Sequence, residues 1–273
     1  MLFTLVLCAA AACAGVDARR HRNNNHGTTG IFRGSWLVSR RGRRIQAYRG
    51  LRYAQAPVGE LRFQPPVSIE SYKSEVDGTS DGPACPQPVF DNYPVDEDCL
   101  RLNVYTPDKE TSQKKLPVLV FIHAGGFYSV SGRSDIAGPQ YLLDRDIVLV
   151  TINYRLGSLG FISTGDSTVP GNNGFKDQVV ALKWVQKNIA AFGGDPNLVT
   201  IAGYSAGSFS VMLHMVSPMS KGLFHRAISM SGSPISQIVI PRHQRHWQSD
   251  KQATKLSNGK FKGNDRLPQN ENL

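Results

Sequence analysis

Three runs of consecutive apolar residues dominate the middle of the chain. They span residues 116–122, 146–152 and 198–202 and consist almost entirely of β-branched and aliphatic side chains. Uninterrupted apolar runs of this length, in contrast to alternating ones, are typical of strands that are covered on both faces. They predict the central strands of a parallel or mixed sheet in an α/β fold.

The apolar positions between the second and third runs have helical spacing. They recur every three or four residues at Phe175, Val179, Leu182, Val185, Ile189 and Phe192. Gly193-Gly194-Asp195-Pro196 follows as a helix stop signal. Strand, helix and strand in this order form a βαβ unit, which predicts a doubly wound, mostly parallel sheet. We expect a second helix over 206–216 and a further strand over 226–230.

The two ends of the chain are patterned differently from this central part. Residues 15–30 lack apolar periodicity and predict a flexible leader, and the pattern over 31–53 favours short strands around an Arg-rich turn. The tail over 241–273 is polar and basic, and we expect it to be disordered. The folded domain is therefore expected to span residues 31–240.

A short apolar run, Leu2–Ala12, directly follows the first methionine. It leads into Ala12-Cys13-Ala14, which has the small-x-small form of a signal-peptidase site. The run is shorter than the roughly 20 apolar residues that a membrane-spanning helix needs. We therefore expect a secretory signal over 1–14, with cleavage as late as residue 18 as an alternative, and a secreted protein without a membrane span.

Removal of such a signal would leave Cys85 and Cys99 as the remaining thiols. An extracellular protein matures in a compartment that favours oxidation, so we expect the two residues to be joined. A closed loop of about 15 residues would stabilise the fold by roughly 3 kcal/mol in the chain-entropy description. The alternative is a pair of buried free thiols.

The formal net charge of +10 is concentrated at the ends of the chain. Residues 17–52 hold 10 basic and 1 acidic side chains, residues 241–273 hold 7 and 3, and the stretch between them holds 14 and 17. A basic run such as Arg40-Arg41-Gly42-Arg43-Arg44 is more often a solvated turn than a docking site. The distribution argues against a nucleic-acid partner.

Gly203-Tyr204-Ser205-Ala206-Gly207 matches G-x-S-x-G, the pattern of a nucleophilic serine at a sharp turn between a strand and a helix. The motif follows one predicted buried strand and opens one predicted helix, which is the context that such a turn requires. We expect side chains at the two glycine positions to collide with neighbouring backbone. The motif predicts Ser205 as a nucleophile.

A nucleophile of this kind needs hydrogen-bond donors for the oxyanion that forms during the reaction. His123-Ala124-Gly125-Gly126-Phe127 leaves a predicted buried strand as a glycine-rich loop. The backbone N–H groups of Gly125 and Gly126, together with that of Ala206, are the expected donors, each worth roughly 3 kcal/mol in the transition state. An ordinary glycine turn is the alternative for this loop taken alone.

These motifs resemble those of the type-B carboxylesterases and cholinesterases. The stretch 192–207 looks like the active-site signature of the family, 97–104 looks like its second signature, and 48–54 and 59–63 are similar to its early landmarks. The resemblance covers about residues 31–240. It implies an α/β-hydrolase fold that is incomplete in its C-terminal half, a Cys85–Cys99 bridge, acyl transfer through Ser205 as in secreted insect esterases, and neither a cofactor nor a metal.

Three departures from the family pattern limit what the resemblance implies, and the last of them leads us to expect uncharged carboxylic esters as substrates. Ala124 stands where the family usually has the first of three glycines, and Tyr204 replaces a common glutamate. The loop over 86–98 contains no tryptophan, so the aromatic cage for choline has no counterpart there. The oligomeric state is not indicated by the sequence.

The acid and the histidine of the catalytic triad have no counterpart at matching positions of this chain. The fold places them after the nucleophile in sequence, whereas His214 and His225 fall in structural segments and His243 and His246 lie in the polar tail. We therefore expect a truncated esterase sequence with little turnover of its own. The alternative is a non-catalytic, esterase-like binding or adhesion protein, although such proteins typically lack the serine.

Overall fold

The computed structural model describes residues 24–27, 29–88, 93–108 and 114–235. The strands are β1 (Asn24–Gly27), β2 (Gly30–Arg33), β3 (Ser35–Val38), β4 (Arg44–Arg52), β5 (Val76–Asp77), β6 (Arg101–Pro107), β7 (Leu116–Ile122), β8 (Val148–Ile152), β9 (Gly194–Tyr204) and β10 (Arg226–Met230). The α-helices are α1 (Ser134–Ala137), α2 (Gly157–Phe161), α3 (Asn173–Asn188) and α4 (Ala206–Val216). Short 3-10 turns lie at Gly59–Leu61, Leu142–Asp144 and Pro218–Ser220.

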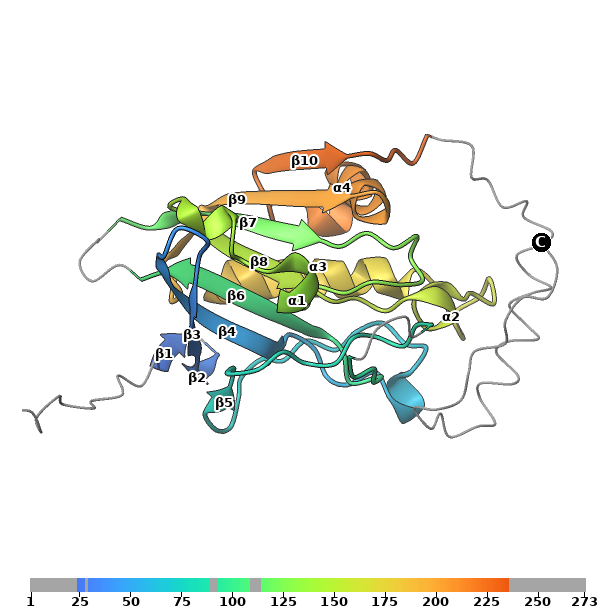
Figure 1. Cartoon of the computed structure of the whole chain (residues 1–273). Coiled ribbons are helices and arrows are strands. Elements are labelled where there is room, and N and C mark those ends of the chain that lie inside the picture. The colour runs from blue at the N-terminus through green and yellow to red at the C-terminus, as the bar shows by residue number, and fades with distance from the viewer. Residues whose placement is uncertain (1–23, 28, 89–92, 109–113, 236–273) are drawn as a thin grey trace, which may run out of the picture.

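One mixed sheet of seven strands forms the centre of the molecule, in the order β10-β9-β7-β8-β6-β4-β3 (Figure 1). β10, β9, β7 and β8 run parallel to one another, and β6, β4 and β3 continue the sheet antiparallel. The unit β8–α3–β9 is the predicted βαβ crossover, and it passes over β7 because β7 lies between the two strands. The expected α/β fold is confirmed, with a parallel half and an antiparallel half.

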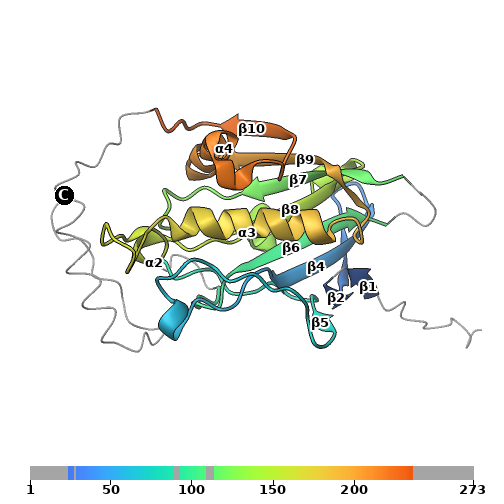
Figure 2. The same ribbon diagram turned by 180° about the vertical axis from the view of Figure 1, so that it is seen from behind.

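The apolar periodicity predicted the elements of the parallel half closely. β7, α4 and β10 have the expected bounds, and β9 contains the run 198–202. β8 covers only residues 148–152 of the run 146–152. The long helix α3 crosses one face of the sheet (Figure 2). The helix ends at Asn188, earlier than the predicted periodicity through Phe192, and residues 189–193 turn into β9. Gly193 in this turn has φ +79°, a left-handed conformation that glycine adopts without steric cost.

The core lies on both faces of the sheet because successive side chains of a strand point to opposite faces. On the face of α3, the residues Val118, Val120 and Ile122 of β7 pack against the helix side chains Leu182 and Val185. The other face holds a smaller cluster around Leu143, Leu149, Ile45 and Tyr105. The alternate residues of β7, Leu119 and Phe121, are only partly buried against that cluster. β7 is thus covered less completely on its second face than its apolar run predicts.

The folded part begins earlier than we expected. Within the expected leader, β1 pairs antiparallel with β2, and β2 pairs with β5 in a small three-stranded sheet. Polar contacts hold this segment to the end of α3: the Asn25 amide donates to the Ala191 carbonyl, and the Thr29 hydroxyl donates to the Asn188 side chain at 2.7 Å. These polar partners have no apolar periodicity, so the sequence pattern did not reveal this pairing.

The Arg-rich turn between β3 and β4 is bonded to acidic side chains of the chain itself. Arg40 and Arg41 lie 3.4 and 3.6 Å from Asp144, and Arg43 lies 2.5 Å from Asp146. The turn is therefore a structural element whose charge is largely paired.

Among the described residues, no helix combines the length and the apolar character needed to cross a bilayer.

Candidate active site

The parallel strands β7, β8, β9 and β10 all end at one edge of the sheet, where ligand sites of open α/β folds form. Ser205 lies at this edge, between the last residue of β9 and the first residue of α4. Its backbone has φ 52° and ψ −117°, a conformation that costs an L-residue about 1–3 kcal/mol and persists only where the surroundings impose it. The serine predicted as the nucleophile therefore stands on a strained strand-to-helix turn.

The glycines of the motif are required by close backbone contacts. A Cβ atom on Gly203 would lie 2.2 Å from the carbonyl oxygen of Gly207. A Cβ atom on Gly207 would lie 2.0 Å from the carbonyl oxygen of Ile122, at the end of β7. The expectation of collisions on both sides of the serine is confirmed, and β9, α4 and β7 can approach this closely only with hydrogen atoms at both positions.

The predicted oxyanion loop starts beside this turn, because Ile122 pairs with Gly203 across β7 and β9. Gly125 and Gly126 both have positive φ, +105° and +59°. Within the described part of the chain, the N–H groups of Gly125, Gly126 and Ala206 have no hydrogen-bond acceptor. The structure thus brings the loop to the serine and leaves three backbone donors available there.

The glycine loop is held at its exit by side-chain amides that local sequence patterns did not identify. The Val130 N–H donates to Gln87 Oε1 at 2.6 Å, and Gln87 Nε2 donates back to the Val130 carbonyl at 3.0 Å. Two residues further on, the Gly132 N–H donates to Asn153 Oδ1, and the Gly132 carbonyl accepts from Asn103 Nδ2 at 2.9 Å. Pairwise contacts at sequence separations of 20 or more residues have no local signature.

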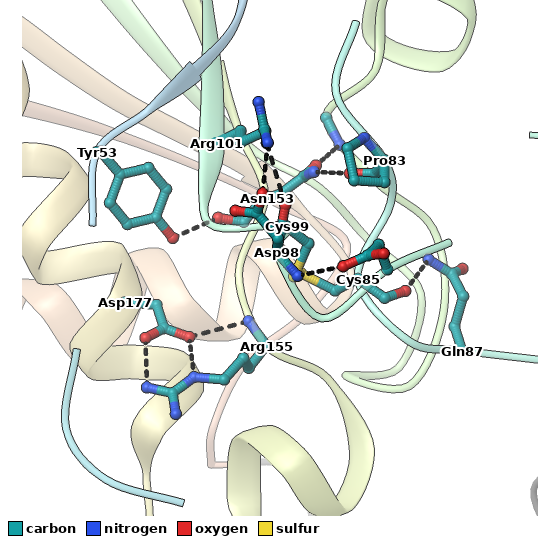
Figure 3. Close-up of a disulfide and its surroundings, with 12 residues drawn as sticks. Tyr53, Pro83, Cys85, Gln87, Asp98, Cys99, Arg101, Asn153, Arg155 and Asp177 are labelled. Atoms are coloured by element: carbon teal, nitrogen blue, oxygen red, sulfur yellow. Dashed lines mark hydrogen bonds and ion pairs between the residues drawn. A yellow bond between two sulfur atoms is a disulfide. The ribbon is translucent and has the colours of Figure 1, made fainter. Parts of the chain in front are cut away.

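Cys85 and Cys99 form a disulfide bond, as expected (Figure 3). The bond lies at the same edge of the sheet, since Cys99 comes just before β6. Gln87, which holds Val130, also donates to the Cys85 carbonyl at 3.1 Å. The disulfide loop therefore braces the far end of the glycine loop.

A buried ion pair lies near the same edge of the sheet (Figure 3). The Arg155 guanidinium donates to both carboxylate oxygens of Asp177 at 2.8 and 2.7 Å, and both side chains are almost fully buried. Arg155 also donates to the carbonyls of Arg62 and Gln64, so the pair ties α3 to the loop after β4. Its role is structural.

The two buried histidines of the described chain are both engaged away from the serine hydroxyl. His123 lies in the predicted oxyanion loop, where its Nδ1 is 2.7 Å from the Ala124 carbonyl and its ring stacks on Tyr154. Burial lowers the pKa of His123 to about 4, against the smaller opposing effect of that hydrogen bond. The ring is therefore neutral and serves to shape the loop.

His214 lies on α4 in a buried hydrogen-bond chain. Its Nε2 is 2.8 Å from Gln178 Oε1 and its Nδ1 is 2.7 Å from the Ser220 hydroxyl. Gln178 donates to Ser210, which donates to the Ala206 carbonyl. This direction requires Nε2 to donate and Nδ1 to accept, and burial lowers the pKa of His214 to about 4. Both ring nitrogens are occupied, in agreement with its expected structural role.

His225 precedes β10 and contacts Val199 through its backbone and its ring. Val199 is six residues before Ser205 along β9, so His225 lies toward the opposite end of the strand, roughly 20 Å from the serine at the rise of an extended strand. His243 and His246 lie outside the described residues. In the described residues the Ser205 hydroxyl has no hydrogen-bond partner.

Comparisons with known proteins agree with this geometry. The sequence profile described as "Carboxylesterase family" matches residues 23–265. The chain is 53% identical over 212 residues to juvenile hormone esterase of Tribolium castaneum and 47% identical over 221 residues to venom carboxylesterase-6 of Apis mellifera, covering 76% and 79% of this chain. The solved structure of juvenile hormone esterase from Manduca sexta, with OTFP covalently attached, superimposes with a TM-score of 0.79 at 35% identity over 88% of this chain.

The chain spans only part of these proteins. It covers 36% of the Tribolium protein, 39% of the Apis protein and 47% of the Manduca structure.

Proposed function

Since the chain belongs to the carboxylesterase family, we propose that its protein hydrolyses carboxylic esters through a covalent acyl-enzyme formed on Ser205. The observation that carries this proposal is the strained backbone of Ser205, φ 52° and ψ −117°, next to three backbone N–H groups without an acceptor in the described chain. A serine held in this way presents its hydroxyl outward from the sheet edge.

The proposed reaction has two halves. The Ser205 oxygen attacks the ester carbonyl carbon while a general base takes the hydroxyl proton, and the carbonyl oxygen becomes an oxyanion. The N–H groups of Gly125, Gly126 and Ala206 donate to that oxyanion. The bond to the alcohol oxygen then breaks, the base returns the proton to the departing alkoxide, and water releases the acid from Ser205 by the same steps.

We further propose that the described residues do not supply the base or its acidic partner. The two buried histidines, His123 and His214, are neutral and bonded elsewhere, and His225 lies toward the other end of β9. The triad order of this fold places both missing groups after the serine in sequence.

The proposed substrates are uncharged esters. Tyr204, which precedes the nucleophile, is 51% exposed and stands where the family commonly has a glutamate. The loop over 86–98 contains no tryptophan that could hold a quaternary ammonium group.

We also propose that the protein is secreted, with a signal over 1–14. The apolar run Leu2–Ala12 and the oxidised Cys85–Cys99 pair support this compartment. One relative is named as a venom carboxylesterase.

The test uses a protein of the relatives' full length that contains this sequence. We expect hydrolysis of a simple aliphatic ester and a fall of at least about 10⁴-fold in kcat when Ser205 is replaced by Ala. Intact-protein mass spectrometry with a slowly released ester should show the acyl group on Ser205. Wild-type protein without esterase activity, or full activity in the Ser205→Ala variant, would favour an esterase-like binding protein instead.

A further inference from the structure

Two serine hydroxyls connect the first turn of α4 to the end of β10. Ser208 Oγ lies 2.5 Å from Ser229 Oγ and 2.7 Å from the Gly232 carbonyl oxygen. Ser208 is fully buried, whereas Ser229 is exposed on the edge strand. The Gly232 carbonyl only accepts: Ser208 donates to it at 2.7 Å, and Ser229 lies 3.4 Å from the same oxygen. With Ser208 donating at the shorter distance, the Ser229 hydroxyl donates to Ser208. Both protons are used, and one connected group joins helix, strand and turn.

The end of β10 and the turn after it, which this group holds, also contact the Ser205 backbone. The Ser205 N–H donates at 2.9 Å to the carbonyl of Met230, the last residue of β10, and this is the final ladder bond between β9 and β10. Ser231 then has φ +57°, which turns the chain back, and a Cβ atom on Gly232 would lie 2.7 Å from the Ser205 carbonyl oxygen. Residues 230–232 therefore wrap around the backbone of Ser205 on both its N–H and its carbonyl side.

The strand that presents this turn is weakly covered in the described chain. β10 pairs only with β9 there, and four of its five residues are exposed. An edge strand of this kind separates from its neighbour more readily than a central strand. The Ser208 contacts add side-chain bonds at the one point where the turn meets the nucleophile.

We propose that Ser208 and Ser229 are positioning residues that hold Ser205 in its strained conformation through the turn 230–232. A strained backbone relaxes when its surroundings stop imposing it. Without the hydroxyl pair, the turn would open from Ser205, the N–H bond to Met230 would lengthen, and the Ser205 hydroxyl would lose its alignment with the Ala206 N–H. This inference rests on the proposed role of Ser205 as the nucleophile.

The test uses a protein of the relatives' full length that contains this sequence, and compares it with its Ser208→Ala, Ser229→Ala and Ser229→Thr variants. Threonine keeps the hydroxyl and suits a strand, so it should restore the contact. Ser39→Ala is the matched control, since it removes a buried serine hydroxyl bond to Asp144 far from the nucleophile. Two quantities are measured for each protein: hydrogen exchange of the Ser205 amide, and the second-order rate constant for labelling of Ser205 by an uncharged fluorophosphonate.

We expect both alanine variants to speed exchange of the Ser205 amide about five- to tenfold, the effect of losing one neutral hydrogen bond. The rate constant for labelling should fall by a similar factor. Ser229→Thr should keep both the exchange rate and the labelling rate within about twofold of the wild-type values. The double alanine variant should resemble the single ones, because the two hydroxyls act as a unit. Unchanged Ser205 exchange in the alanine variants, or equal changes in Ser39→Ala, would overturn the inference. A third outcome is faster Ser205 exchange in the alanine variants while no protein, the wild type included, is labelled. It would support the positioning contact and contradict the role of Ser205 as the nucleophile.

Discussion

At the scale of single residues, the site depends on glycines, whose lack of a side chain allows backbone segments to approach closely. Gly207 has no side chain, and this allows the first turn of α4 to lie against the end of β7, with the Ile122 carbonyl 2.0 Å from where a Cβ atom would be. Backbone on both sides of this contact belongs to regular elements, so neither can move away without breaking hydrogen bonds.

We therefore expect Gly207→Ala to destabilise the fold by about 3 kcal/mol or more, the range of severe backbone clashes. Gly222→Ala is the control: Gly222 has positive φ, +78°, which Gly207 in α4 does not have, but open space surrounds Gly222, and the expected cost is about 1 kcal/mol. Urea unfolding followed by circular dichroism measures both changes. Equal losses of stability in the two variants would contradict the role assigned to Gly207.

The buried histidine of α4 predicts how stability depends on pH. Burial lowers the pKa of His214 to about 4, whereas an unfolded histidine has a pKa of about 6.5. Between these values the unfolded chain binds a proton that the folded chain does not. The contribution of neutral His214 to the free energy of unfolding is therefore complete above about pH 6.5 and is lost as the pH falls toward 4.

The slope of unfolding free energy against pH should include up to about 1.4 kcal/mol per pH unit from His214 in this interval. His214→Gln should flatten the slope by that amount, whatever its effect on absolute stability. Denaturant titrations at half-unit steps from pH 4 to 7.5 give the slopes for the wild-type protein and for His214→Gln. Equal slopes in the two proteins would contradict the prediction.

At the scale of elements, the sequence predicts those features that depend on local patterns. It does not predict those that depend on contacts between distant residues. The bounds of β7, α4 and β10 follow from apolar runs and from the turn motif at Ser205, which are local features. The partners that fix the glycine loop come from other elements: Gln87 from the disulfide loop and Asn153 from the end of β8. No periodicity marks such residues, because their role is defined by pairs that meet only after folding.

The brace between Gln87 and Val130 gives a prediction for the glycine loop. Gln87→Ala removes both bonds to the Val130 backbone and should cost about 1–3 kcal/mol locally. Hydrogen exchange over residues 125–130 should then accelerate, and reduction of the Cys85–Cys99 bond should have the same effect because Gln87 is held beside it. Gln64→Ala, which removes a surface bond to Thr168, is the control. Exchange rates that respond to neither change would show that the loop is fixed by other contacts.

At the scale of the whole molecule, the sheet edge collects groups from separate parts of the chain around a single serine. The glycine loop, the disulfide loop, the turn after β10 and the start of α4 all meet there. Two ionisable features close to this edge carry no net charge, since His123 is buried and neutral and Arg155 is paired with Asp177. These neutral and paired groups support the proposal that the substrates are uncharged.

We therefore expect an enzyme of the relatives' length that contains this sequence to prefer neutral esters. The measurement is kcat/KM for an aliphatic ester and for its choline analogue of equal acyl length, with a value at least about tenfold lower for choline because no aromatic cage compensates for desolvation of the cation. A control substrate with a neutral, branched alcohol of similar size separates charge from bulk. A preference for the choline ester would contradict the assignment.

The 273-residue chain by itself is expected to turn over esters very slowly. Ser205 and its backbone donors are in place, yet within the described residues the serine hydroxyl has no base to take its proton. An oxyanion hole and binding without a working triad leave only about 10³ to 10⁴-fold acceleration over water. Exposed apolar side chains on α4 and β10, with Val216 79% and Met215 61% exposed, also favour self-association of this chain.

The experiment expresses the chain as written, confirms its fold by circular dichroism and its size by gel filtration, and measures ester turnover beside Ser205→Ala. We expect the two proteins to differ by less than about tenfold, because removing the nucleophile costs little where the triad is not assembled. Replacing His243 and His246 by Gln tests the remaining source of a base, since both lie outside the described residues. Sustained turnover that requires Ser205 and one of these two histidines would contradict the prediction. It would show that this chain supplies a base of its own, and the acidic partner would then also have to lie within these 273 residues.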